Sequence, residues 1–294
     1  MAQILDGKWV RDEIQREWKP RVDELAVLRR PPGLAAVLVG NNPASEIYVR
    51  NKVKACADFG IYSEKHTPPG AIATEELLDL IDSLNRRDEI DGILVQMPLP
   101  PQVDSRRVLN AVRPDKDVDG FHPVNVGNLV ANIPGPRPCT PSGIIELFKR
   151  YDIPIAGRRA VVIGRSDIVG KPMALLLLHE SATVTVCHSR TRGLPAECRR
   201  ADILVAAMGR PAFVTEEFIG LGATVIDVGI NRLDEAQRSA IFGEAPSRSV
   251  IGDVHPLHVQ TAAKAYTPVP GGMGPLTIAM LMVNTIHAAE QHLR

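Results

Sequence analysis

The chain has 294 residues, enough for one large domain or two smaller domains with complete hydrophobic cores. Lysine plus arginine equals aspartate plus glutamate at 34 each, so the formal net charge is zero and no general attraction to nucleic acid is expected. Aromatic residues make up only 4% of the chain, which also argues against surfaces that stack nucleic-acid bases. We therefore expect no nucleic-acid partner.

Other broad features predict a cytoplasmic protein. The N-terminal segment is charged and lacks the apolar stretch of a signal peptide, and the longest apolar run, MALLLL, is far too short to span a bilayer. Four scattered cysteines form no C-x-x-C pair and show no zinc-like spacing with histidine, which is typical of reduced, mostly buried thiols. We expect no membrane association and no metal.

The first part of the chain alternates short apolar segments with helical patterns. Asn42 and Pro43 are typical of a helix N-cap and first turn, Gly60 stands where that helix would end, and Thr74 would cap the next helix. The pattern predicts a βαβαβ unit with a parallel sheet, its strands at 33–40, 61–66 and 91–98 and its helices near 43–59 and 74–87.

A second alternating series follows a proline-rich passage. Thr140 and Pro141 predict the start of a helix, after which come five β-rich segments, at 159–164, 182–189, 201–209, 223–229 and 249–254. This series is typical of a doubly wound nucleotide-binding domain. The final amphipathic helix is expected to return to the first domain. We therefore predict an α/β protein of two domains, with 1–140 completed by 275–294 as the first domain and 141–274 as the second.

The stretch GRSDIVGKPMALLL follows the predicted strand RAVVIG, as a dinucleotide-binding turn would. Gly164 and Ser166 take the positions that need small residues, and Gly170 opens the helix slightly later than in G-x-G-x-x-G. The motif is imperfect, and the alternative is an ordinary glycine-containing βα turn. The strand before it and the helix after it favour a nucleotide site.

The end of the next strand, CHSRTR, indicates which nucleotide. An NAD site expects an acidic residue here for the ribose hydroxyls, but His188, Ser189 and Arg190 stand in its place, with Arg165 in the first loop. A guanidinium can bind phosphate oxygens bidentately, which favours the 2′-phosphate of NADP over NAD. Arg192 could equally be a simple surface charge.

A tyrosine and a lysine four residues apart occur in YVRNK. On a helix, Ser45, Tyr48 and Lys52 fall within ~60° of one another beside an apolar stripe, whereas Lys54 points away. Lys52 could merely lay its stem over apolar surface and keep its ammonium in water. A short-chain dehydrogenase would place such a pair after the nucleotide turn, but here it comes more than a hundred residues before it, which excludes that interpretation.

Together, the motifs resemble one enzyme family closely, the bifunctional methylenetetrahydrofolate dehydrogenase/methenyltetrahydrofolate cyclohydrolases. The resemblance rests on VGNNPASEIYVRNKVKAC, DGILVQMPLP, PDKDVDGFHPVNVG, RPCTPSGII, GRSDIVGKPMALLL, HSRT and TPVPGGMGPLT, in the expected order. It implies NADP-dependent oxidation of 5,10-methylene-tetrahydrofolate and hydrolysis of the methenyl product to 10-formyl-tetrahydrofolate. It also implies tetrahydrofolate derivatives as partners, a place in one-carbon metabolism and purine biosynthesis, and a homodimer formed through the nucleotide domain.

The resemblance also assigns residues to sites. Lys52 takes the central catalytic role with Gln96 as its partner, Tyr48 stacks on the folate ring system, and Asp119 holds the polar edge of the pterin. Ser45 lies near the lysine, while Pro270 and Gly271 close the folate cleft and the Val269–Pro270 bond is expected to be cis. The implied NADP-binding residues are Gly164, Arg165, Ser166, Ser189 and Ile230.

The chemistry suggests a division of labour. Hydride loss leaves a cation delocalised over two nitrogens and needs mainly positioning, whereas hydrolysis needs proton transfers. Desolvation of Lys52 would make a neutral amine available, so we hypothesise that it matters more for hydrolysis. Asp119 could instead form a turn, and Gln96 could be an ordinary buried amide. A nucleotide-sensing module without turnover and a dehydrogenase with weak hydrolysis remain alternatives. The role of Asp253 is left open.

Overall fold

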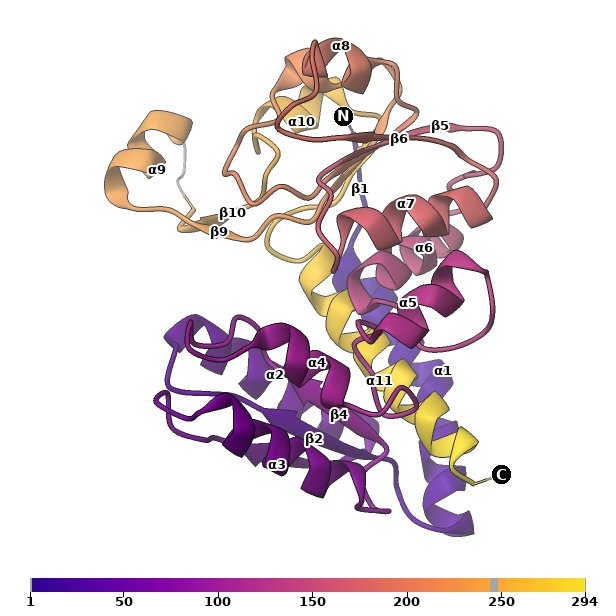
Figure 1. Cartoon of the computed structure of the whole chain (residues 1–294). Coiled ribbons are helices and arrows are strands. Elements are labelled where there is room, and N and C mark those ends of the chain that lie inside the picture. Colours follow the sequence, from indigo (N-terminus) through magenta and orange to yellow (C-terminus); the bar gives the residue numbers. More distant parts are fainter. Residues whose placement is uncertain (1, 244–247, 294) are drawn as a thin grey trace. The chain divides into compact units, whose positions relative to one another are not determined.

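The computed structural model describes residues 2–243 and 248–293. The chain divides into two compact units (Figure 1). Unit 1 comprises Met1–Arg11 and Thr140–Thr277, and unit 2 comprises Asp12–Cys139 and Ile278–Arg294. Two long helices, α1 (Gly7–Leu28) and α11 (Met273–Gln291), supply residues to both units.

Unit 2 contains the predicted parallel βαβαβ arrangement. Its three strands are ordered β3-β2-β4, all parallel, with β2 at Gly33–Val37, β3 at Tyr62–His66 and β4 at Gly92–Val95. The connecting helices are α2 (Pro43–Phe59) and α3 (Thr74–Asn85), and the unit also holds α4 (Ser105–Ala111) and α5 (Pro123–Val130). Every residue of the central strand β2 is buried, as expected where helices cover a parallel sheet.

The helix ends of unit 2 follow local capping chemistry. Asn42 Oδ1 accepts the Ser45 N–H at 3.1 Å, and Gly60 has a φ of +86° just beyond the end of α2, which confirms both predicted ends. The predicted cap at Thr74 is wrong by one residue, since the N-cap of α3 is Ala73. Thr74 Oγ1 instead accepts the Asp104 N–H at 3.0 Å, which ties α3 to the loop before α4.

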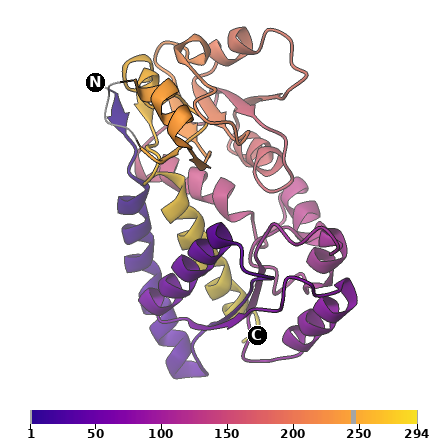
Figure 2. The same ribbon diagram turned by 90° about the vertical axis from the view of Figure 1, so that its left-hand side faces the viewer.

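The C-terminal helix returns to the first domain, as predicted. Within unit 2, Arg21 of α1 forms an ion pair with Glu290 of α11, and the rings of Trp18 and His287 meet edge to face at 4.7 Å. Figures 1 and 2 show these two helices side by side from both directions.

A buried carboxylate anchors the end of α11 in unit 2. The side chain of Asp91 is 1% exposed; it accepts hydrogen bonds from Arg30 Nη1 at 2.6 Å and from the Gly33 N–H at 2.8 Å, and it meets His292 Nδ1 at 2.9 Å. Burial acts to raise the pKa of Asp91, but hydrogen bonds from His292, Arg30 and Gly33 outweigh it and hold the pKa below the ordinary value.

Asp91→Asn is therefore expected to lower the free energy of unfolding by about 3 kcal/mol at neutral pH, because it removes the buried carboxylate that pairs with the half-buried Arg30 guanidinium. Since the folded pKa is depressed, the stabilisation is complete above the unfolded pKa, near ~4, and is lost as the pH falls through the folded pKa. Urea unfolding of wild type and variant measures the difference. The neighbouring exposed Asp88→Asn is the matched control, and an equal effect of both changes would contradict the anchor.

Unit 1 is built on a six-stranded parallel sheet, which confirms the predicted doubly wound fold. The strand order is β1-β11-β8-β7-β5-β6. The strands are β1 (Gln3–Ile4), β5 (Arg159–Ile163), β6 (Thr183–Cys187), β7 (Ile203–Ala206), β8 (Thr224–Asp227) and β11 (Ala265–Tyr266). Its helices are α6 (Cys139–Arg150), α7 (Gly170–His179), α8 (Leu194–Arg199), α9 (Glu235–Phe242), α10 (His258–Ala262) and the 3-10 turn η1 (Glu216–Phe218). The short outer strands β1 and β11 were not predicted.

Two predictions for unit 1 are wrong in detail. The segment 249–254 adds no strand to the main sheet, because β10 (Val250–Ile251) pairs antiparallel with β9 (Asn231–Arg232) in a separate ribbon. The Asp253 N–H then donates to the side chain of Asp227, Oδ1 at 2.8 Å, rather than to the backbone of a strand. The helix predicted to start at Thr140 begins at Cys139, and Thr140 Oγ1 bonds Thr277 Oγ1 at 2.8 Å.

Candidate functional site

The first group of predicted site residues lies in unit 2, around Lys52. This lysine stands on α2 and only 9% of it is exposed. Its Nζ donates to Gln96 Oε1 at 3.1 Å. Gln96 follows β4 directly, and its Nε2 donates to the Met97 carbonyl at 2.8 Å. Because the Gln96 NH2 group is held by the Met97 carbonyl, the amide oxygen of Gln96 points toward the lysine.

Asp119 lies within electrostatic reach of this pair. Burial raises its pKa to about 6, the charge of Lys52 acts in the opposite direction, and the charge of Asp117 adds to the rise. Asp117 serves as the turn former, since its carboxylate accepts the N–H groups of Gly120 at 3.1 Å and His122 at 2.8 Å. The turn-forming role considered for Asp119 thus belongs to its neighbour, and Asp119 is free for another task.

The loop that carries Asp119 is held by a residue that the sequence analysis missed. Asn284 of α11 is buried, and its Nδ2 donates to the Val118 carbonyl at 2.8 Å and to the Arg137 carbonyl at 2.9 Å. A Cβ added at Gly120, which has a φ of +73°, would lie 2.6 Å from the Arg137 carbonyl carbon. The available signal was a lone asparagine inside an otherwise apolar helix.

Ser45 and Tyr48 share α2 with Lys52. Ser45 is buried in the first turn of the helix, and Tyr48 is half-buried one turn before the lysine. At helical spacing these side chains lie on one side of α2. Unit 2 therefore brings together a buried amine, an amide acceptor and a carboxyl group whose pKa is raised, with an aromatic ring on the same helix. Such a set can orient a flat polar ligand and transfer protons.

The predicted nucleotide turn lies in unit 1, directly after β5. Gly164 has a φ of +132°, and a Cβ there would lie 2.2 Å from the Ala207 carbonyl oxygen, so only glycine fits. A Cβ at Gly170 would lie 2.4 Å from the Gly164 carbonyl oxygen. Ser166 Oγ accepts the N–H groups of Val169 and Gly170, each at 3.2 Å, which closes the turn at the start of α7.

The remaining predicted cofactor residues lie at the same carboxyl edge of the sheet. Ile163 of β5 is in register with Cys187 of β6, so Arg165 and Ser189 follow paired positions and both are exposed. Ile230 follows β8 and is 48% exposed. The strands β6 and β7 flank β5 on opposite sides, which makes this edge the topological switch point where doubly wound sheets bind ligands.

Pro270 and Gly271 lie in unit 1, after β11. The Val269–Pro270 bond is cis, which confirms that prediction, and Met97–Pro98 is a second cis bond that was not predicted. Gly271 has a φ of +109°, and its carbonyl accepts the Gly7 N–H at 3.0 Å. The assignment of Pro270 and Gly271 to the folate site stays a prediction from the resemblance.

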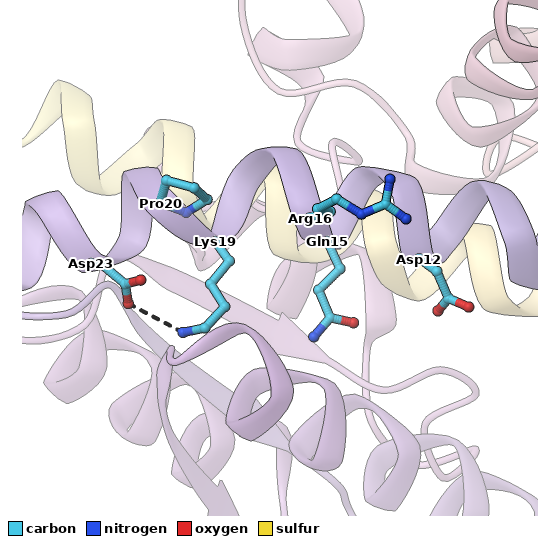
Figure 3. Close-up of a pocket in the computed structure, with 6 residues that line it drawn as sticks. All are labelled: Asp12, Gln15, Arg16, Lys19, Pro20 and Asp23. Carbon is cyan, nitrogen blue, oxygen red and sulfur yellow. Dashed lines mark hydrogen bonds and ion pairs between the residues drawn. The ribbon is translucent and has the colours of Figure 1, made fainter.

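Other features of the described chain do not carry this chemistry. A shallow groove along α1 is lined by Pro20 and by polar side chains, among them an exposed ion pair between Lys19 and Asp23 (Figure 3). Across residues 2–243 and 248–293, no three His, Cys, Asp or Glu side chains are grouped to hold a metal ion. None of the helices in those ranges combines the length and apolar character needed to cross a bilayer.

Comparison with known proteins assigns both parts of the chain. Residues 5–119 match the profile of the tetrahydrofolate dehydrogenase/cyclohydrolase catalytic domain, and residues 138–293 match that of its NAD(P)-binding domain. The chain is 65% identical to the bifunctional protein FolD of Solibacter usitatus, over 99% of this chain and 98% of the relative.

Solved structures agree. The bifunctional FolD enzyme of Campylobacter jejuni shares 42% identity and a TM-score of 0.92, over 99% of each chain. The Trypanosoma brucei methylenetetrahydrofolate dehydrogenase-cyclohydrolase, solved with NADP cofactor and an inhibitor, shares 38% identity and a TM-score of 0.92, over 100% of this chain and 99% of that one.

Proposed function

Since the chain belongs to the tetrahydrofolate dehydrogenase/cyclohydrolase family, we propose that the group around Lys52 is where it processes folate. The protein is a bifunctional enzyme, an oxidoreductase and a hydrolase. It oxidises 5,10-methylene-tetrahydrofolate to the 5,10-methenyl form with NADP and hydrolyses that product to 10-formyl-tetrahydrofolate. The alternative of a sensing module without turnover is therefore wrong.

One observation carries the placement of the folate site: the buried Lys52 Nζ donates to Gln96 Oε1 at 3.1 Å, with Asp119 in electrostatic reach. In this proposal Gln96 orients the amine, which handles the proton transfers as water attacks the methenyl carbon. Tyr48 stacks on the ring system and Ser45 supports the helix face beside the lysine. Asp119 accepts hydrogen bonds from the polar edge of the pterin as a carboxylate.

For the cofactor, we propose that the carboxyl edge of the sheet in unit 1 binds NADP through Gly164, Arg165, Ser166, Ser189 and Ile230. The tight turn at Gly164 lets the backbone approach the pyrophosphate. When bound, NADP supplies the hydride acceptor. The exposed Arg165 guanidinium and Ser189 hydroxyl would hold the 2′-phosphate that NAD lacks.

Arg165→Ala is accordingly expected to raise KM for NADP by about tenfold or more, because a charged hydrogen bond is lost, and to change KM for NAD much less. Parallel assays of wild type and variant with methylene-tetrahydrofolate and each nucleotide measure this. Arg192→Ala is the matched control on the same surface. If Arg165→Ala changed KM for NADP and NAD by the same factor, the assignment of the 2′-phosphate would be wrong.

We propose that the catalytic folate-binding domain comprises 1–140 completed by 275–294, and the nucleotide domain 141–274. In support, the boundaries between the two compact units fall at Cys139–Thr140 and at Thr277–Ile278. The compact units differ from the proposed domains at the N-terminus, where residues up to Arg11 belong to unit 1 because β1 pairs with β11. Limited proteolysis followed by mass spectrometry would locate the boundaries.

We further propose that the protein is a cytoplasmic homodimer formed through the nucleotide domain. The strand β6 ends the main sheet of unit 1, and Val186 on it and Leu178 on the neighbouring α7 are 40% and 56% exposed. Such an edge is a template for pairing with another chain. The four cysteines are free and buried, which suits a reducing compartment. Light scattering of the purified protein and cell fractionation test the two parts separately.

A further inference from the structure

Asp253 lies fully buried in unit 1, and the reaction described above gives it no task. Its Oδ2 accepts the N–H groups of Met208 at 2.7 Å and Gly209 at 2.9 Å. Its Oδ1 accepts the Arg210 N–H at 2.8 Å and Asn231 Nδ2 at 3.0 Å. Four donors thus converge on one carboxylate, three of them from consecutive backbone positions.

The segment that Asp253 holds lies at the switch point of the sheet. Residues 208–210 come shortly after β7, the strand beside β5. Ala207 immediately precedes them, and the Gly164 turn packs against its carbonyl oxygen. A Cβ added at Gly164 would lie 2.2 Å from that oxygen. Any movement of residues 208–210 would therefore move the backbone that supports the nucleotide turn at Gly164.

Asp253 also reaches the loop after β8. Asn231, one of its donors, directly follows Ile230. A Cβ at Gly229 would lie 2.3 Å from Asp253 Oδ1, so this loop passes directly over the carboxylate. Asp227 fixes the backbone of Asp253 in turn, since its carboxylate accepts the N–H groups of Asp253 at 2.8 Å and Val254 at 3.0 Å.

We infer that Asp253 is a positioning residue for NADP. It does not touch the cofactor but fixes the loops after β7 and β8 against the nucleotide turn at Gly164. The inference rests on the cofactor placement proposed above. An acceptor-only side chain is needed because all four partners are donors. Asparagine has nearly the same shape, but it would turn an NH2 group toward backbone N–H groups and leave them unpaired.

Asp253→Asn is expected to raise the Kd and KM for NADP by about tenfold or more, with kcat at saturating NADP largely kept. Hydrolysis of methenyl-tetrahydrofolate consumes no NADP, so its rate is expected to stay within about twofold of wild type. Calorimetric titration with NADP and the two separate activity assays give these values. Asp202→Asn is the control, because the exposed Asp202 also accepts a backbone N–H, that of Arg159 at 2.8 Å, but precedes β7 at the opposite end of the strand.

Two results would overturn the inference: an unchanged Kd for NADP, or a parallel loss of both activities, which a general structural role predicts. Should Asp253→Asn fail to fold, Asn231→Ala removes one of the four donors and is expected to weaken NADP binding by a smaller factor, again with hydrolysis kept. Unchanged NADP binding by that folded variant would count against the inference.

The Arg165→Ala variant distinguishes a failure of this inference from a failure of the proposed NADP site. If Arg165→Ala leaves NADP binding unchanged, the cofactor placement itself is wrong. If Arg165→Ala weakens NADP binding and Asp253→Asn does not, the placement stands and only the role of Asp253 fails.

Discussion

Lys52→Met is expected to slow hydrolysis of methenyl-tetrahydrofolate by roughly 10²–10⁴-fold, the range for loss of a positioned acid or base. Hydride transfer is expected to fall far less, because it moves no proton and depends on how the nicotinamide is positioned over the donor carbon. Methionine lacks the amine but keeps an unbranched apolar stem of similar length to that of lysine, so the apolar packing of α2 should survive. The two rates are measured separately, with methenyl substrate alone and with methylene substrate plus NADP.

Lys54→Met provides the matched control for Lys52→Met. Lys54 stands on the same helix, two residues away, and is exposed, so its loss is expected to leave both rates near wild type. Equal abolition of both activities by Lys52→Met, with folate still bound, would refute the division of labour. It would indicate instead that the lysine is needed for substrate geometry in both reactions.

Asp119→Asn is expected to raise KM for methylene-tetrahydrofolate by about 10- to 100-fold. The reason is that a carboxylate accepting pterin hydrogen bonds is replaced by a neutral amide, and hydrogen bonds to charged groups are worth more than neutral ones. Steady-state kinetics at saturating NADP measure the change. A wild-type KM in this variant would remove Asp119 from the folate site.

The same residue predicts a pH dependence. Burial raises the pKa of Asp119 to about 6, so its carboxylate is ionised above that pH and becomes protonated as the pH falls through it. Because the ionised form is the proposed acceptor, kcat/KM for methylene-tetrahydrofolate should decline below about pH 6. The Asp119→Asn variant should lack this inflection, and its persistence there would assign the titration to another group.

Local signals predicted most of the fold. The alternation of short apolar segments with helical patterns was sufficient for both parallel sheets, and glycine at positions 60 and 164 marked backbone that has positive φ. The segment at 249–254 misled because its apolar residues suggest a strand of the main sheet. Its strand β10 instead pairs in a separate ribbon, and the buried carboxylate of Asp227 accepts the N–H groups of Asp253 and Val254. Sequence periodicity contains no information about such long-range side-chain acceptors.

The sequence predicted the residue types of the site but not the long-range hydrogen bonds that hold them in place. Helical spacing placed Tyr48 and Lys52 on one side of α2, yet the bond from Lys52 to Gln96 joins residues 44 positions apart and came only from the resemblance. The contacts of Asn284 and Asp253 could not be predicted for the same reason, since each side chain bonds backbone groups distant in the sequence. The asparagine in a mostly apolar helix was a signal for Asn284, but it did not indicate which groups that side chain bonds.

The central claim, that Lys52 serves the second reaction more than the first, is tested most directly by a coupled progress curve. Wild type and Lys52→Met are each mixed with methylene-tetrahydrofolate and NADP, and NADPH and the methenyl species are followed together. We expect wild type to form NADPH without lasting methenyl accumulation, and Lys52→Met to accumulate the methenyl species in step with NADPH. A Lys52→Met enzyme that formed no NADPH while still binding folate, or that cleared the methenyl species as fast as wild type, would contradict the account.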